Sequence, residues 1–243
     1  MPDTVTATVP SQESAGLFPP IADYGFLSNC EQSCLVAPDG SVEWLCLPRP
    51  DAPSVFGALL DRAAGLFRFG PGNTNVPQHR RYIPGTNVLE TTWQTPTGWM
   101  TVRDLLVVDQ LKHENRRADY HRAPADFGAT GVLLRIATCV SGRVEIAVNC
   151  GPVFDYGTSG AKWTYQGDGY DTMTTASPDG KVRLALAGAR SRLHSCGHSI
   201  ESLARRGQKP VHFLFAAQKS PPLTSSNSTA STDLTMSVLT VGD

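Results

Sequence analysis

The chain has 243 residues, of which 40% are hydrophobic and 18% charged, with a formal net charge of −1. This balance argues against a nucleic-acid partner, which would require a basic face. No apolar run approaches the roughly 18 residues of a membrane-spanning helix. Residues 1–17 lack the basic and apolar regions of a secretory signal. We therefore expect a cytoplasmic protein with one large β domain or two small domains, and with no membrane partner.

The first predicted element is a β-hairpin. Residues 33–38 and 41–47 flank an Asp-Gly dipeptide, which is a strong signal for a two-residue turn. In this register Cys34 lies opposite Leu45, and the thiol of Cys46 points to the other face of the sheet. The two thiols therefore cannot form a disulfide. We expect the cysteines of this chain to be reduced and buried.

A proline-rich loop and a short helix are predicted to follow this hairpin. Residues 48–53 have the sequence Pro-Arg-Pro-Asp-Ala-Pro, whose prolines restrict the backbone and hold Arg49 and Asp51 at fixed angles. The apolar run that follows has helical spacing, and Ser54 is placed to be its N-cap. From the residues alone, the loop is either a structural turn or a loop that faces a ligand.

The rest of the chain is predicted to be rich in β-strands. A hairpin joins residues 87–94 to 99–108 and sets Gln94 opposite Trp99, and another hairpin is predicted to turn at Ser141-Gly142. Further strands are predicted at residues 65–70, 161–166, 170–177, 181–188 and 209–217. Strands at this spacing, separated by Gly, Pro and Asp turns, are typical of an antiparallel β-sandwich.

Three low-periodicity segments set the predicted domain boundaries. Residues 1–17 are predicted to be a disordered lead, 18–217 a single β-sandwich domain, and 218–243 a linker or a divergent tail rich in Ser and Thr. Residues 109–130 are polar and without periodicity, which indicates a long loop between two halves of the sandwich.

Few residues are arranged for chemistry. The sequence has no nucleophile elbow, Walker loop or zinc-protease motif. His194 and His198 have i, i+4 spacing but no obvious third ligand, so we expect neither a metal nor another cofactor. A glycosidase would need two carboxylates, and six lie in or near predicted strands: Glu31, Glu43, Asp51, Glu90, Asp104 and Glu145. Because Glu43 alternates with Val42 and Trp44, it is predicted to lie on the solvated face of a half-buried strand.

Three ordered segments carry a family resemblance. They are Pro20–Gly25 (PIADYG), Leu35–Cys46 (LVAPDGSVEWLC) and Pro48–Asp61 (PRPDAPSVFGALLD). In this order they resemble the start of the trehalase and glucoamylase-like proteins of glycoside hydrolase family 15. The likeness is closest to the mycobacterial-type trehalases, which hydrolyse α,α-trehalose to two glucoses, and it covers residues 18 to 186.

The resemblance implies a division of labour within a larger enzyme. In that family an N-terminal β-sandwich, of the supersandwich type, precedes an (α/α)6 barrel whose paired glutamates act as general acid and general base in an inverting hydrolysis. Such a barrel needs at least about 200 residues, so the barrel and its catalytic pair are expected to be missing here. The implied function is a domain that is inactive alone and that packs on and shapes the catalytic barrel. Its ligand would be α,α-trehalose or another α-glucoside.

The resemblance also suggests roles for particular residues. The proline-rich loop is expected to face the barrel, with Arg49, Asp51 and Ser54 contacting the barrel or the rim of its sugar pocket. Trp44 is expected to pack in or near the core of the sandwich. None of the glutamates in this chain matches a catalytic position of the family.

Two other functions compete with this interpretation. A free-standing carbohydrate-binding module would need aromatic side chains aligned on one exposed face, for which Trp93, Trp99 and Trp163 are the candidates. An autonomous hydrolase would need to use carboxylates of the sandwich itself.

Overall fold

The computed structural model describes residues 18–108, 131–166, 172–188, 199–205 and 211–219. A short 3-10 helix, η1 (Ile21–Asp23), and one α-helical turn, α1 (Phe154–Gly157), accompany the strands. The strands are β1 (Gly25–Ser28), β2 (Ser33–Val36), β3 (Ser41–Cys46), β4 (Ser54–Phe56), β5 (Leu66–Pro71), β6 (His79–Tyr82), β7 (Leu89–Thr95), β8 (Gly98–Leu106), β9 (Gly131–Gly151), β10 (Ser159–Gly160), β11 (Thr164–Gln166), β12 (Thr172–Ala176), β13 (Val182–Gly188), β14 (Ser199–Arg205) and β15 (Val211–Lys219).

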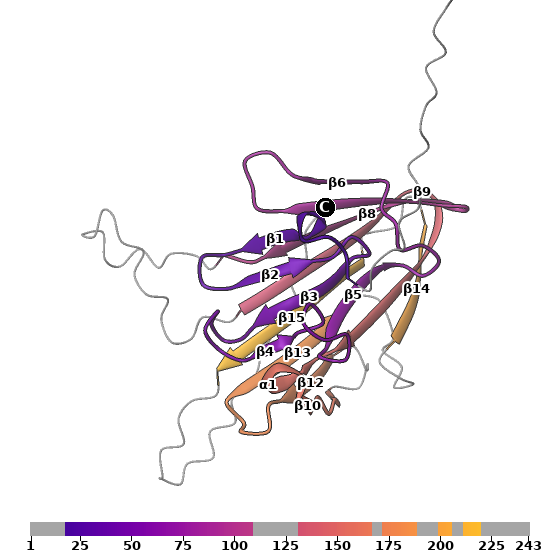
Figure 1. Ribbon diagram of the computed structural model, residues 1–243. Helices are drawn as coiled ribbons and strands as arrows, with labels where there is room; N and C mark the ends of the chain where they lie inside the picture. Colours follow the sequence, from indigo (N-terminus) through magenta and orange to yellow (C-terminus); the bar gives the residue numbers. More distant parts are fainter. Residues whose placement is uncertain (1–17, 109–130, 167–171, 189–198, 206–210, 220–243) are drawn as a thin grey trace, which may run out of the picture.

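The strands form two antiparallel layers that share one strand (Figure 1). The first layer contains β1, β2, β3 and β5, followed by the C-terminal half of β9 and by β14, with β4 paired to β3. The second layer places the N-terminal half of β9 between β8 and β15, with β7 and β6 on one side and β13, β12 and β11 on the other. This arrangement confirms the predicted antiparallel β-sandwich.

Strand β9 passes from one layer into the other, so the hairpin predicted at Ser141-Gly142 is wrong. Residues 131–142 pair with β8, and residues 146–151 pair with β5 without any reversal of the chain. The register with β8 shifts beside Cys139, and Gly142 has φ +68°. A Cβ at Gly142 would clash with the carbonyl oxygen of Thr97. The dipeptide thus forms a bulged bend, the usual device by which a strand changes sheets.

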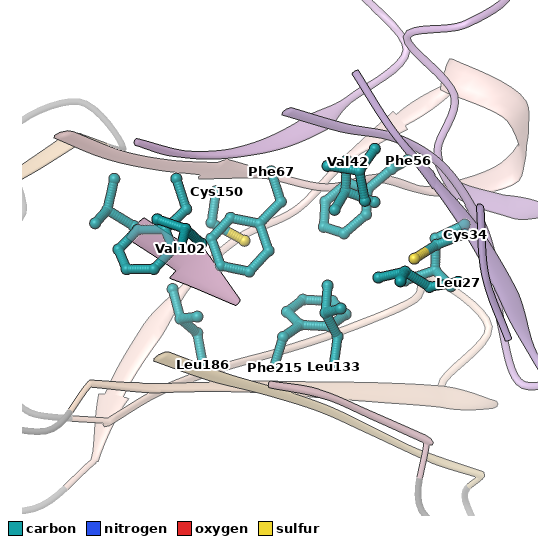
Figure 2. Packing of buried hydrophobic residues seen from close by; sticks show 14 of the residues in the cluster. Leu27, Cys34, Val42, Phe56, Phe67, Val102, Leu133, Cys150, Leu186 and Phe215 are labelled. Carbon is teal, nitrogen blue, oxygen red and sulfur yellow. The ribbon is translucent and has the colours of Figure 1, made fainter. Parts of the chain in front are cut away.

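The core lies between the two layers (Figure 2). Phe56 of β4 and Phe67 of β5 meet Phe215 of β15 with ring centroids 5.2 and 6.0 Å apart. Figure 2 shows Leu133 and Leu186 on the same side of the core as Phe215. Tilted aromatic contacts of this kind add to the burial of apolar area, so this aromatic cluster holds the two layers together.

The first hairpin has the predicted register at Cys34, which lies opposite Leu45. Closer to the turn, however, Glu43 is an extra residue that has no partner on β2, which makes a β-bulge. Because of the bulge, Val42 and Leu45 are both buried, whereas Trp44 is half-buried and does not belong to the buried cluster. Trp44 was expected in or near the core, and it lies half-buried beside the bulge.

The short helix predicted after this hairpin is also wrong. Ser54–Phe56 form β4, which pairs with β3 and is buried along its whole length. Turns follow it, in which the amides of Leu60 and Asp61 donate to the carbonyl of Gly57. Among the described residues, α1 is the only α-helical segment, and it lies about a hundred residues later in the chain. Three consecutive buried side chains are typical of an interior strand. The spacing of apolar residues alone does not distinguish such a strand from a short buried helix.

The other predicted hairpins agree with the structure. Gln94 lies opposite Trp99 between β7 and β8, and Ala176 lies opposite Arg183 between β12 and β13. Strands β1, β6 and β14 were not anticipated from the sequence. The predicted lead, the long loop at 109–130 and most of the tail lie outside the described residues.

The described cysteines are all free, as expected. Cys34, Cys46 and Cys150 are buried, whereas Cys30 is exposed and Cys139 is half-buried. Burial raises the pKa of the Cys34 thiol to about 12. No helix in the described part of the chain is long and apolar enough to cross a bilayer.

A fully buried ion pair joins the layers. Arg135 of β9 lies directly opposite Asp104 of β8, and its Nε donates to the carboxylate at 2.8 Å. The same guanidinium donates to the carbonyl of Phe67 at 2.7 Å and to that of Gly40 at 2.6 Å, both of which belong to the first layer. Its Cζ atom also lies 4.9 Å from the centre of the Phe67 ring. The charge of Arg135 is therefore neutralised by Asp104 within one layer, and its guanidinium is hydrogen-bonded to the other layer.

We predict that Arg135→Leu lowers the free energy of unfolding by about 3–5 kcal/mol, because it leaves the Asp104 carboxylate buried without its cation. Urea unfolding followed by circular dichroism measures this change. The control is Arg103→Leu, whose exposed guanidinium pairs with Glu90 at 2.9 Å and should contribute at most about 1 kcal/mol. Equal losses in the two variants would contradict the prediction.

Candidate functional site

The three segments that carry the family resemblance meet at the side chain of Glu43. Arg62, which follows the third segment, donates to the two carboxylate oxygens of Glu43 at 2.6 Å each. The hydroxyl of Tyr24, in the first segment, donates to the same carboxylate at 2.5 Å. The side chain of Glu43 is only 3% exposed. The solvated position predicted for Glu43 is therefore wrong, because a bulge and two covering segments enclose it.

Backbone contacts explain how these side chains come together. The amide of Leu59 donates to the carbonyl of Glu43 at 3.0 Å, which brings the turn that carries Arg62 over β3. On the other side, the guanidinium of Arg80 donates to the carbonyls of Asp23 and Val36, which ties the segment of Tyr24 to β2. The two covering segments thus have attachments that do not involve the side chain of Glu43, and they close over it.

The Glu43 carboxylate raises the pKa of both of its donors. Burial, followed by the hydrogen bond to Glu43, raises the pKa of Tyr24 to about 12. The hydrogen bond to Glu43 also raises the pKa of Arg62. The ring of Phe18 lies 4.4 Å from Cζ of Arg62 and covers its guanidinium. Since donors occupy both carboxylate oxygens, Glu43 is arranged to hold three segments together and not to exchange a proton with a substrate.

Other carboxylates considered from the sequence are also held by arginines. Glu90 accepts from Arg81 at 2.8 Å and from Arg103 at 2.9 Å, and the hydrogen bond from Arg81 is the largest cause that lowers the pKa of Glu90. Asp104 is held by Arg135 in the core. Within the described ranges, no group of three His, Cys, Asp or Glu side chains is placed to bind a metal ion. The paired histidines at 194 and 198 lie outside those ranges.

The structure separates the three residues predicted at the proline-rich loop. Arg49 and Asp51 form a surface ion pair at 3.1 Å, with side chains 75% and 71% exposed. Ser54 is instead buried at the start of β4. The side-chain Nε2 of Gln32, just before β2, donates to the carbonyl of Pro48 at 3.1 Å and supports the loop. Arg49 and Asp51 can therefore meet another domain directly, whereas the side chain of Ser54 does not reach the surface.

The tryptophans do not form an exposed sugar-binding row. Trp93 is fully buried, and Trp163 is half-buried against the core. Trp99 is exposed at the end of the β7–β8 hairpin. Sequence reasoning missed Tyr24 and Arg62, although both lie within or directly beside the segments of family resemblance.

The fold and this site define an antiparallel β-sandwich domain that is organised by structural ion clusters. The chain belongs to the family described as "Trehalase-like, N-terminal", whose model matches residues 14–200. The trehalase of Mycobacterium tuberculosis is 56% identical over 212 residues, which are 84% of this chain and 31% of that protein. The trehalase of Mycolicibacterium smegmatis is 53% identical over 192 residues, 76% of this chain and 29% of that protein.

A more distant relative gives the same picture. Trehalase 1 of Sulfolobus acidocaldarius is 40% identical over 86 residues, which are 35% of this chain and 15% of that protein. The chain spans about a third of the length of the mycobacterial relatives that it matches. About two thirds of each mycobacterial relative lies outside the region that this chain matches.

We predict that Tyr24 makes the stability of the domain depend on pH in the alkaline range. The pKa of Tyr24 is about 12 in the folded state and about 10 in the unfolded state. Between these values the unfolded chain has released the phenol proton and the folded chain has kept it, so rising pH favours unfolding. The contribution is complete below pH 10 and is lost by pH 12.

Urea unfolding of the unaltered chain and of Tyr24→Phe, at a series of pH values, tests this prediction. The difference in unfolding free energy between them should be largest below pH 10 and should shrink as the pH approaches 12. Tyr156→Phe is the control, because that side chain is exposed. A difference for Tyr24→Phe that is constant with pH would contradict the assignment.

Proposed function

We propose that this chain serves as the N-terminal sandwich domain of a trehalase-type α-glucosidase, and that it packs on and shapes a catalytic barrel. The observation that carries the proposal is the family match over residues 14–200, together with two trehalases of which the chain spans about a third. In this proposal the parent reaction is the inverting hydrolysis of α,α-trehalose to glucose, and the catalytic glutamates belong to the barrel.

The side-chain geometry supports a non-catalytic role. An inverting glycosidase needs one carboxylic acid and one carboxylate that are free to exchange protons across the scissile bond. Glu43, Glu90 and Asp104 are each engaged by at least one arginine. A carboxylate whose oxygens are occupied by a guanidinium is not placed to transfer a proton to a substrate. The sandwich is therefore suited to positioning another domain.

The substrate belongs to the same proposal. The names of the relatives favour α,α-trehalose, and another α-glucoside is the alternative that the test must include. The chain would influence this substrate only through the barrel that it shapes. Among surface residues, Arg49 and Asp51 are proposed to contact the barrel or the rim of its sugar pocket, because their exposed ion pair lies on a loop stiffened by prolines.

Glucose release is the experiment that tests the proposed function. The purified 243-residue chain is expected to release no glucose from α,α-trehalose or from maltose. A chimera, in which this chain replaces the matched region of the Mycobacterium tuberculosis trehalase, is expected to release glucose from trehalose faster than from maltose.

Two results would overturn the proposal. Release by the isolated chain above a heat-treated control would mean that carboxylates of the sandwich perform the chemistry. A folded chimera without activity on either sugar would mean that this sandwich does not support a trehalase barrel. Preference for maltose would replace trehalose by another α-glucoside as the substrate.

The contact proposed for Arg49 and Asp51 has its own prediction. Asp51→Ala in the chimera should lower kcat/KM by about three- to tenfold, which corresponds to about 1 kcal/mol of lost contact. The same change in the isolated chain should alter the unfolding free energy by less than about 0.5 kcal/mol, because the pair is exposed. Asp179→Ala is the control, since this exposed aspartate pairs with Lys181 in the turn after β12. Unchanged kinetics for Asp51→Ala would remove the proposed contact.

A further inference from the structure

We propose that the outer face of β1, β2 and β3 is the surface on which the remaining region of the trehalase docks. This inference rests on the proposed function and specifies the face of the sandwich that meets the partner. Its centre is a row of three apolar side chains, Phe26, Leu35 and Trp44, which we call the apolar row.

Strand register places these side chains next to one another. Phe26 lies directly opposite Leu35 on the neighbouring strand, and Leu35 lies directly opposite Trp44. Side chains of directly opposed residues project from the same face of a sheet. Phe26 is 51% exposed, and Leu35 and Trp44 are half-buried, whereas their neighbours Leu27 and Leu45 are buried in the core. The row therefore lies on the outer face of the first layer.

The apolar row is supported by rigid structure at both ends. At one end the bulge at Glu43 fixes Trp44 beside the Tyr24–Glu43–Arg62 cluster. At the other end the hydroxyl of Tyr82 donates to the carbonyl of Phe26 and accepts from its amide, at 2.8 Å in each case. Because Tyr82 occupies these groups on the edge of β1, a partner would meet the side chains of the face instead of adding a strand to the edge.

The apolar character is concentrated at this end of the layer. Further along the same layer, the residues that point away from the core are mixed: Arg68 on β5 and Glu145 and Asn149 on β9 are polar, whereas the half-buried Leu66 and Ala147 are apolar. Two exposed apolar side chains lie near the Trp44 end of the row. Ile21 is 71% exposed and Leu60 is 66% exposed, and they lie on the two segments that close over Glu43. The outer face is thus most apolar over β1, β2 and β3.

The size of this surface favours an occupant joined to the same chain. Aromatic side chains bury about 150–250 Å² each. The area of the row and of the two neighbouring side chains therefore falls in the lower range of areas buried between domains. Separate proteins bury about 800 Å² per partner in a stable complex, whereas a covalent linker supplies an effective concentration in the millimolar range. About two thirds of the length of the mycobacterial relatives lies outside the matched region. We therefore assign the row to that remaining region and not to a second copy of this chain.

Hydroxyl-radical footprinting, read out by mass spectrometry, tests the assignment. The oxidation rates of Phe26 and Trp44 are measured in the isolated chain and in the chimera with the Mycobacterium tuberculosis trehalase. Both rates should fall at least about fivefold in the chimera, because an interface core excludes water. Trp99, which is exposed beside the turn of the β7–β8 hairpin, is the matched control. Its oxidation rate should change less than about twofold.

Variants provide a second readout. The chimera is expected to unfold in one thermal transition, and the double variant Phe26→Ser/Trp44→Ser should split it into two, since the domains are then uncoupled. The matched variant Trp99→Ser should keep one transition. The isolated chain with the double variant should unfold at nearly the same temperature as without it, which separates uncoupling from a folding defect.

The outcomes distinguish this inference from the proposed function. Equal oxidation of Phe26 and Trp44 in the two proteins, with trehalose hydrolysis intact, would overturn the docking surface and leave the proposed function standing. Protection in a chimera that releases no glucose would support the surface while the proposed function fails. Protection that rises with the concentration of the isolated chain would assign the row to a second copy and overturn the proposal.

Discussion

In the part of the chain that the structure describes, the guanidinium of Arg135 is bonded to both layers at once. It neutralises Asp104 on the adjacent strand and donates to carbonyls of Phe67 and Gly40 across the core. A buried charge is costly unless its bonding is nearly complete. Any sliding of one layer over the other would break two of these bonds and leave the charge exposed to apolar surroundings. The arginine therefore determines how the layers are superimposed as well as which residues of β8 and β9 face each other.

Gly40 shows how local backbone geometry serves this interaction. Its φ of +84° directs its carbonyl toward Arg135, and a Cβ at this position would lie 2.6 Å from the carbonyl oxygen of Phe69. Only glycine combines this conformation with so close an approach. The Asp-Gly signal that predicts the first hairpin thus has a second role in the core. The Glu43 cluster also joins segments that are distant in sequence. It lies on the outside of the sandwich and attaches the segments of Tyr24 and Arg62 to the sheet.

Turn chemistry and alternation were sufficient to predict the sandwich and most of its hairpins. They failed where one extra residue alters the phase of a strand. Glu43 and the bend at Ser141-Gly142 are both bulges, and a bulge cannot be recognised from the alternation that it interrupts. The solvated position predicted for Glu43 was wrong for this reason. Tyr24 and Arg62 were missed because their partner is distant in sequence, and only the family resemblance brought their segments to attention.

The sharing of β9 has a consequence for how the chain matures during synthesis. The ribosome produces β1 to β8 before it produces Gly131–Gly151, yet β5 and β8 both need that strand as a neighbour. Until then each half of the nascent polypeptide carries an unpaired edge, which is where strands of different molecules associate. The two halves are thus joined only when β9 emerges, and each still awaits later strands, β14 in the first layer and β15 in the second. Nascent chains that stall before residue 151 would carry both unpaired edges and be exposed to aggregation.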